Sequence, residues 1–278
     1  MANSQKAAPA KKKQGFTGVR NAIWVIVICG IAGVCFFQYV LGNPSNFQGG
    51  DNANAPLPGN LLGTIYKGGI VVPVIITLLF TVIALSVERA LALSTANGKG
   101  KLGKFVREVK AAVTAGDMAK AQQLCDKQQG VVGNVVTASL KAYAEMENTA
   151  GLKKEQKVAK IQQAHEEAVQ LEMPTLQMNM PILATLVTLG TLTALFGTVV
   201  GMIKSFAALA AGGGGDSLEL STGISEALVN TASGILTSWV AVVSYNFYSN
   251  KIDKLTYALD EVGYTIAKTY EANHTEEA

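Results

Sequence analysis

The chain contains 278 residues, of which 49% are hydrophobic and 15% are charged, and its formal net charge is +3. Long segments without any charge indicate an integral membrane protein rather than a soluble one. The three cysteines form neither a disulfide framework nor a metal-binding spacing. The small positive charge is no sign of a nucleic-acid partner, because the basic residues are distributed in a way that reports membrane topology.

Four apolar stretches approach or exceed the roughly 20 residues that a helix needs to cross a bilayer. They are residues 23–41, 69–87, 181–211 and 218–245. The last two are longer than a single crossing, so we expect them to tilt or to project from the membrane. The sequence therefore predicts an all-α integral membrane protein with four transmembrane helices, whose long helices extend into a cytoplasmic helical region.

The first stretch has an alternative interpretation, because a basic flank followed by an apolar run is also typical of a secretory signal peptide. Its apolar run is too long for a usual signal peptide, and no small-x-small cleavage site stands out before Asn43. We therefore expect an uncleaved transmembrane helix over residues 22–42.

Basic residues are divided unevenly between the two sides of the four spans. Residues 1–21 carry five basic residues and no acidic one, and residues 94–180 carry eleven lysines and one arginine. Residues 42–66 and 212–220 carry no basic residue. The positive-inside rule places the basic segments, and with them both termini, in the cytoplasm.

Segment 43–67 is rich in Asn, Gly and Pro, so we expect a periplasmic loop there. Lys67 and Lys204 are the basic exceptions on this side, where their long side chains can reach the outer interface. The expected order of segments is a basic cytoplasmic tail at 1–21, transmembrane helix 22–42, periplasmic loop 43–67, transmembrane helix 69–92, cytoplasmic helices 94–180, transmembrane helices 181–211 and 218–247, and a cytoplasmic C-terminal helix 250–270.

The cytoplasmic segments show the spacing of amphipathic helices. Apolar side chains recur at helical spacing over residues 105–113, and a second helix is expected at 118–128. A third, at 153–172, is rich in Ala, Gln and Glu and leads into the third span. The tail over 251–270 shows the same spacing and is expected to continue the fourth span as one helix.

Glu226 is the one carboxylate that lies well inside an apolar stretch of this sequence. If a helix begins near Ser217, Glu226 lies roughly 13 Å below the edge of the span, at about 1.5 Å per residue. An ionisable group at this depth is a functional-site candidate, because its burial is costly. The same helix face carries Thr222, Asn230, Ser233, Thr237 and Ser244. This stripe indicates one wall of an ion path, and the alternative is a carboxylate that reaches back to the outer interface.

The third span carries hydroxyl side chains along one broad face: Thr188, Thr191, Thr198 and Ser205. A hydroxyl in a membrane helix often bonds only the carbonyl one turn back. Four aligned hydroxyls, opposite a helix that carries a carboxylate, favour a polar path instead. Gly197 and Gly201 are spaced for close helix packing, which is the ordinary meaning of such a pair.

Other motifs favour structural interpretations. The glycine run at 212–215 lacks the ending of a phosphate-binding loop and is expected to form a turn between two spans. Ser233 is no protease nucleophile, since both histidines, His165 and His274, fall in cytoplasmic segments. His165 is expected to be solvated beside Glu166 and to bind no metal. We therefore expect no enzymatic activity, no metal and no cofactor.

Three passages carry a family pattern: residues 68–73 (GGIVVP) with Val87-Glu88-Arg89, residues 115–121 (AGDMAKA) with Cys125, and residues 195–203 (LFGTVVGMI) with 225–228 (SEAL) and Thr231-Ala232. Together they resemble the MotA/TolQ/ExbB family of proton-channel subunits, and most of all its ExbB branch. The third passage is the most specific. The resemblance covers roughly residues 68–266, so we expect an ExbB-like domain at 68–278, and the helix at 22–42 is an addition to the family's three-span plan.

The resemblance implies that Thr198, Glu226 and Thr231 line a lumen, and Asn230 and Ser233 join them from the polar stripe. Thr231 lies about 140° from Glu226 on an ideal helix, so the stripe and the family positions coincide only in part. A wide pore lined by two helices from each subunit accommodates both.

The resemblance also implies partners. It implies a homopentamer in a bacterial inner membrane, around a dimer of ExbD-like single-span subunits whose membrane helix bears an Asp. Proton flow through this complex would drive a TonB-like protein that energises outer-membrane transport. A TolQ-like or gliding-type motor would share the motifs and differ in its output partner. A structural membrane scaffold is an alternative of another class, and it predicts that Glu226 tolerates replacement by Gln or Ala.

The charge pattern predicts that both termini are cytoplasmic and that residues 43–60 are periplasmic. A cysteine placed at Ser45, in a chain without its three native cysteines, should react with an impermeant thiol reagent in intact cells. Protection of this site until the cells are lysed would contradict the four-span topology.

Overall fold

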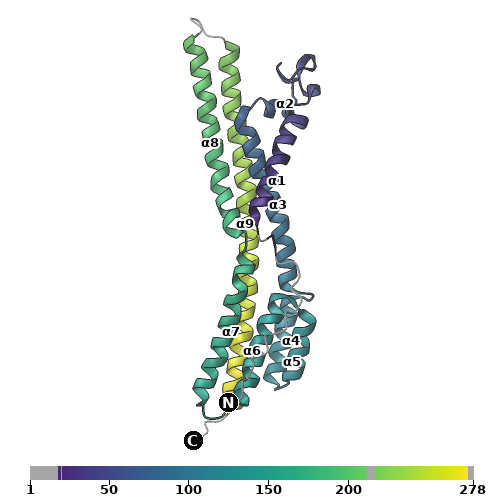
Figure 1. Cartoon of the computed structure of the whole chain (residues 1–278), viewed down its shortest axis with the longest axis vertical. Helices are drawn as coiled ribbons and strands as arrows, with labels where there is room; N and C mark the ends of the chain where they lie inside the picture. The colour runs from purple at the N-terminus through teal and green to yellow at the C-terminus, as the bar shows by residue number, and fades with distance from the viewer. Residues whose placement is uncertain (1–17, 20, 212–216, 275–278) are drawn as a thin grey trace, which may run out of the picture. The chain divides into compact units, whose positions relative to one another are not determined.

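The computed structural model describes residues 18–19, 21–211 and 217–274 (Figure 1). Most of the basic tail and the glycine run at 212–215 lie outside these described residues. Among the described residues the chain is helical, and the pairing of Phe47 with Pro56 is an isolated bridge rather than a strand. Four helical stretches contain a segment long and apolar enough to cross a membrane: Ala22–Leu41, Gly69–Thr114, Lys154–Ala210 and Glu219–Asn273. The prediction of an all-α membrane protein with four transmembrane helices is confirmed.

The elements follow one another as α1 (Ala22–Cys35), η1 (Phe36–Leu41), η2 (Pro44–Asn46), η3 (Gln48–Gly50), α2 (Leu61–Tyr66), η4 (Gly69–Val71), α3 (Val72–Asn97), α4 (Leu102–Thr114), α5 (Met118–Gln128), α6 (Gly130–Glu147), α7 (Lys154–Gln177), α8 (Met180–Ala211) and α9 (Ser217–Asn273). They form two compact units. The apolar unit comprises Val19–Arg89 and Asn179–Ser249, and the polar unit comprises Gly18, Ala90–Met178 and the described chain from Asn250 onward.

The additional N-terminal helix packs on α3 within the apolar unit. A Cβ atom at Gly33 of α1 would lie 2.7 Å from Oγ1 of Thr77, so the two helices approach closely there. Beyond this contact, Leu41 joins Val72 and Ile76 in a buried cluster, which Phe36 and other aromatic side chains cover. Helix α1 and segment η1 are therefore built into the same apolar core as the second span.

Segment 43–67 is more ordered than the loop that the sequence predicted. Asn46 is buried, and its side-chain amide donates to the carbonyls of Val40 and Leu41 at 2.9 and 3.0 Å. The side chain of Asn60 accepts from the backbone of Leu62 and caps α2, which the sequence analysis missed. Asparagine side chains that cap and bridge the backbone explain how an Asn-rich segment without helical periodicity still folds.

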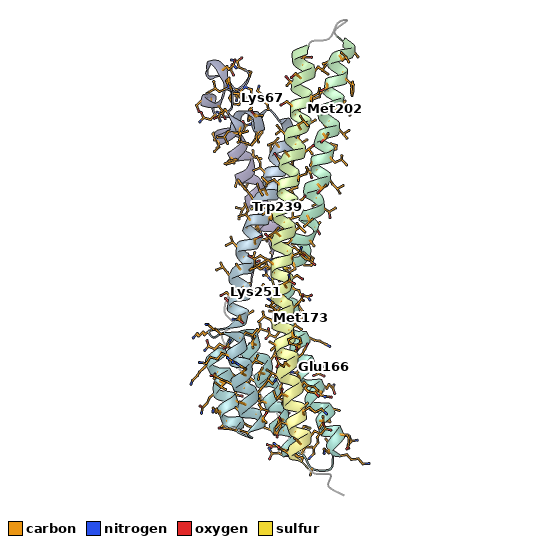
Figure 2. All side chains as sticks on the ribbon, turned by 180° about the vertical axis from the view of Figure 1, so that it is seen from behind. Lys67, Glu166, Met173, Met202, Trp239 and Lys251 are labelled. Atoms are coloured by element: carbon orange, nitrogen blue, oxygen red, sulfur yellow. The ribbon has the colours of Figure 1, made fainter. Side chains whose placement is uncertain are left out.

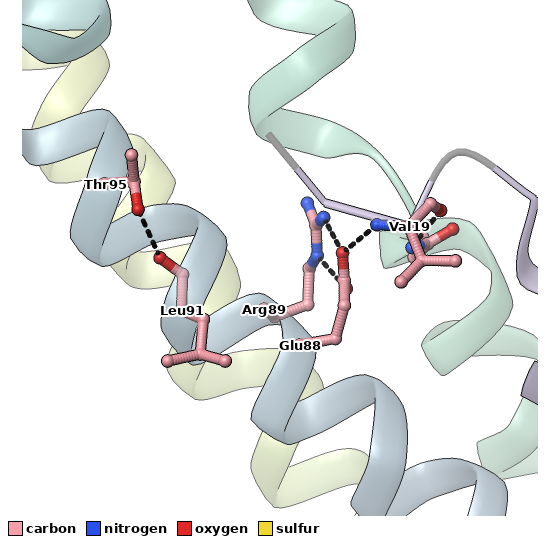
Figure 3. Close-up of polar contacts among 6 residues, drawn as sticks. Val19, Glu88, Arg89, Leu91 and Thr95 are labelled. Atoms are coloured by element: carbon pink, nitrogen blue, oxygen red, sulfur yellow. Dashed lines mark hydrogen bonds and ion pairs between the residues drawn. The ribbon is translucent and has the colours of Figure 1, made fainter. Parts of the chain in front are cut away.

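The second half of α3 holds a buried ion pair (Figure 3). Arg89 is fully buried, and its Nε donates to Oε2 of Glu88 at 2.7 Å. Oε1 of Glu88 also accepts the backbone N–H of Val19 at 2.8 Å, while the carbonyl of Val19 accepts from Asn179 at 3.2 Å. The pair thus neutralises two buried charges and ties the segment before α1 to the start of α8.

Asn179 also marks a break that the sequence did not show. The helix over 153–172 was expected to lead directly into the third span, but α7 ends at Gln177 and α8 begins at Met180. Asn179 between them has φ +62°, a left-handed conformation that asparagine tolerates better than most residues. Pro181 in the first turn of α8 fits there because its missing N–H would be unbonded in any case.

The polar unit is helical over most of the segments for which the sequence predicted helices. The apolar positions predicted between residues 105 and 113 of α4 are buried: Phe105, Val106, Val109, Ala112 and Val113. Helix α5 spans the predicted residues 118–128, and Asp117 caps it by accepting a 2.9 Å bond from the N–H of Lys120. Helix α6 was not predicted as a separate element. The fourth span continues as the single helix α9, which has 57 residues, and Lys110 of α4 pairs with Glu261 on it at 2.6 Å.

His165 is buried, and the expectation of a solvated histidine is wrong. Its Nδ1 lies 2.8 Å from Oγ of Ser139, and its Nε2 has no hydrogen-bond partner among the described residues. Gly263 of α9 gives the ring its space, since a Cβ atom there would overlap the imidazole. Burial lowers the pKa of His165, while the carboxylates of Asp260 and Glu166 raise it to a lesser extent.

This burial predicts that the polar unit loses stability in mild acid. The unfolded chain binds a proton at His165 near pH 6.5, whereas the folded chain keeps the ring neutral to lower pH. The free energy of unfolding should therefore fall as the pH drops below about 6.5, by at most about 1.4 kcal/mol per pH unit, and level off below the folded pKa. His165→Gln should reduce this dependence in thermal melts between pH 7.5 and 5.5, whereas His274→Gln serves as the control. An unchanged pH dependence in His165→Gln would contradict the assignment.

Small residues bring α8 and the first part of α9 together, and these segments lie side by side in Figure 1. A Cβ atom on Gly201 would lie 2.8 Å from the carbonyl oxygen of Gly223 and 2.9 Å from the nitrogen of Ala227. A Cβ atom on Gly197 would lie 2.7 Å from Asn230 in the same way. The backbones therefore approach as closely as small residues allow.

We predict that Gly201→Leu disrupts assembly, because a leucine side chain cannot fit against the backbone of Gly223 and Ala227 without separating the helices. The size of the purified complex on native gels measures the effect. Gly103→Leu is a matched control, since Gly103 is helical but has no atom near the position of a Cβ. A complex of normal size for Gly201→Leu would count against the packing role.

Candidate functional site

The carboxylate of Glu226 lies in a space that the start of the second span leaves open for it. Glu226 is on α9, nine residues after the helix begins at Ser217, and the whole residue, backbone included, is 5% exposed. Gly69 of η4 faces it with φ +80°, and a Cβ atom there would collide with Oε1 of Glu226. A residue other than glycine would therefore be strained in its backbone and would displace the carboxylate.

Lys204 is the ion-pair partner of Glu226. Its Nζ lies 2.7 Å from Oε1 and 2.9 Å from Oε2, so one ammonium bonds both carboxylate oxygens. The two side chains differ in burial, with 7% exposed for Glu226 and 52% for Lys204. From the sequence, Lys204 was expected to extend to the outer interface, and this pair was not predicted. A signal was present, because Lys204 lies seven residues before the end of α8 and Glu226 lies nine after the start of α9.

Asn230 lies one turn beyond Glu226 and is completely buried. Its amide nitrogen donates to the carbonyl of Gly68 at 2.9 Å. Its Oδ1 has no hydrogen-bond partner among the described residues, although an unpaired buried acceptor is costly. Glu226 and Asn230 therefore face the Gly68–Gly69 corner of their own chain, and their predicted place on a lumen stays a prediction.

Thr198 and Thr231 form a second polar group, between α8 and α9. Their hydroxyls are within hydrogen-bond distance of each other, and each also lies 3.0 Å from a carbonyl oxygen one turn back, those of Ala194 and Ala227. Each hydroxyl has one hydrogen, so when one threonine donates to the other, only the accepting threonine can donate to its own backbone carbonyl. Both side chains are half-buried. The offset of about 140° between Thr231 and Glu226 on an ideal helix accounts for the separation of the two groups.

The remaining residues of the predicted stripe contribute less. The hydroxyl of Thr237 is buried and donates to the carbonyl of Ser233 at 2.9 Å, the bond that the structural interpretation expects. Ser233 itself is half-buried. The structure thus brings Glu226, Lys204, Gly69 and Asn230 together, and it pairs Thr198 with Thr231 beside them.

The arrangement can hold and exchange a proton. A carboxylate exists with or without a proton, and hydroxyl groups both donate and accept hydrogen bonds. Such groups within apolar spans are rare, because their burial is costly, and they commonly mark ion and proton pathways. Large apolar side chains are exposed along α8 and α9, including Trp239, which is labelled in Figure 2.

Comparison with known proteins finds a family match over the residues of α8 and α9 described above. Residues 128–261 match the model of the MotA/TolQ/ExbB proton channel family, and this range includes Lys204, Glu226 and both threonines. A putative biopolymer transport protein, ExbB-like 1, of Synechocystis is 29% identical over 66% of this chain and 69% of its own length.

Two further relatives are Tol-Pal system proteins named TolQ. The protein of Pseudomonas aeruginosa is 29% identical over 45% of this chain and 54% of its own length. The protein of Haemophilus influenzae is 26% identical over 70% of this chain and 87% of its own length. Residues 128–261 therefore belong to the MotA/TolQ/ExbB proton channel family, in a chain whose described residues include four helices long and apolar enough to cross a membrane.

Proposed function

We propose that this chain is the channel subunit of a proton-driven motor and that Glu226 takes part in coupling proton flow to work. The observation that carries the proposal is the buried Glu226 carboxylate in the apolar span of α9, within the residues that the family match covers. A carboxylate without function would be replaced at little cost by an uncharged side chain, because its burial is unfavourable. The adjacent hydroxyl pair of Thr198 and Thr231 supplies polar groups that a proton path needs.

The proposed assembly is a homopentamer around a dimer of ExbD-like single-span subunits. Large apolar side chains on α8 and α9 are exposed in the single chain, among them Phe196, Ile203, Leu228 and Trp239. Neighbouring copies, lipid and the partner helices are the apolar surroundings that would cover them. An Asp on the partner's membrane helix would take up the proton, with Glu226, Thr198 and Thr231 providing the polar surround.

The proposed location is a bacterial inner membrane, with both termini in the cytoplasm. The basic residues of the polar unit and the absence of any basic residue from 42–66 support this orientation. Lys67, at the end of that segment, donates to the carbonyl of Ala53 at 2.9 Å and lies 5.7 Å from the centre of the Phe47 ring.

The proposed output is a TonB-like protein that energises outer-membrane transport. A TolQ-like output is the second candidate, favoured by the two relatives named as Tol-Pal system proteins. Purifying the complex from its native cells and identifying the subunits that co-purify would discriminate between the two outputs.

Glu226→Gln tests the proposed role directly. This change removes the titratable charge while keeping the size of the side chain, and Lys204 is exposed enough to turn to water when it loses its partner. We expect near-normal expression and assembly and a loss of most proton-dependent transport, on the order of tenfold or more. Glu226→Asp should keep part of the activity. Glu219→Gln, an exposed carboxylate in the first turn of α9, is the matched control. Full transport by Glu226→Gln in energised cells would favour the structural scaffold.

A further inference from the structure

Glu226 and Lys204 differ in how far each depends on the contact between them. Glu226 is almost completely buried, and both of its oxygens bond the same ammonium group at 2.7 and 2.9 Å. An ionised carboxylate in this position is stabilised only while a cation or several donors face it. Lys204 is half exposed and can carry its charge into water or to the membrane interface. Glu226 therefore depends on Lys204 far more than Lys204 depends on Glu226.

The other basic side chains of the described apolar unit are engaged elsewhere. Lys67 bonds the carbonyl of Ala53, and Arg89 bonds Glu88 at the opposite end of α3. In the part of this unit that the structure describes, Lys204 is thus the cation that balances the charge of Glu226.

The two side chains also stand on a rigid support. Gly201, three residues before Lys204, contacts Gly223, three residues before Glu226, so the backbones of α8 and α9 are closely packed one turn away. Gly69 closes the far side of the carboxylate. With both backbones held, the long and half-exposed side chain of Lys204 is the part of the contact that can move.

We propose that Lys204 is a positioning residue that holds the ionised carboxylate of Glu226 against Gly69, and that protonation of Glu226 releases it. This inference rests on the proposed function, which supplies the proton. One proton adds to a carboxylate oxygen, the ammonium of Lys204 keeps its three hydrogens, and the net charge of the pair changes from zero to +1. Lys204 then turns toward water, and loss of the proton from Glu226 restores the contact. Binding and release of a proton at Glu226 thereby move the side chain of Lys204 away from α9 and back.

The release can be measured as the chemical reactivity of Lys204. Glu226→Gln imitates the protonated carboxyl group, so in the intact purified complex an amine-acylating reagent should modify Lys204 several-fold faster than in the parent. Lys67 in the same sample is the internal reference, and peptide mass spectrometry gives the ratio of the two modified lysines. Glu219→Gln should leave the ratio unchanged. An unchanged ratio in Glu226→Gln would overturn the proposal.

Substitutions of Lys204 give the second test. Lys204→Met should lower the melting temperature of the complex and reduce proton-dependent transport on the order of tenfold, because it leaves the carboxylate unpaired. Lys204→Arg should restore most of both, since it keeps the charge. In the Glu226→Gln background, Lys204→Met should have little further effect on the melting temperature. An equal loss of stability in both backgrounds would show that Lys204 acts independently, for example on lipid phosphates, and would overturn the proposal.

The outcomes distinguish a failure of the proposed function from a failure of the proposed role of Lys204. Full transport by Glu226→Gln would contradict the proposed function. Loss of transport in Glu226→Gln, together with full transport and unchanged stability in Lys204→Met, would leave the proposed function standing and refute the role of Lys204.

Discussion

The close approach of α8 and α9 is the constraint on which the candidate site depends. Glycine and alanine let the two backbones meet at Gly201 and Gly223, and again at Ala194 and Gly234. Because the contact leaves no room for adjustment, the side chains on either side of it are placed at matching levels. Lys204 is brought into contact with Glu226, and Thr198 with Thr231, across this packing.

In the described part of the apolar unit, the two buried carboxylates, Glu88 and Glu226, are each paired with a basic side chain, and the two pairs differ in kind. Glu88 and Arg89 are adjacent in the sequence and both buried, and backbone groups of other segments complete their bonding. Such a pair is suited to hold the chain together. Glu226 and Lys204 come from different helices, and one of them is half exposed. A pair of this second kind can open without leaving a charge buried on both sides.

Long, strongly periodic elements were predictable from the sequence, and short ones were not. The four spans, α5 and the continuous α9 follow from apolar spacing over many residues. The short helix α2 depends on the cap that Asn60 supplies, and the break after α7 depends on the left-handed conformation of Asn179. Both are decided by one or two side chains, which periodicity does not report. The burial of His165 was missed for a related reason. The helix around His165 is polar in sequence, but in the structure the His165 ring packs against α9, where Gly263 leaves space for it.

The sequence by itself determined that Glu226 is an ionisable group far inside an apolar span, because depth along a helix follows from counting residues. It also determined the small residues that let two spans approach. Only the tertiary structure decided which groups face the carboxylate. Whether Lys204 turns toward Glu226 or toward the membrane surface, and whether Gly69 or a larger residue closes the space behind it, depends on the rotation of α8, α9 and η4 about their axes. That rotation is set by the packing of whole helix faces, which no single sequence motif contains.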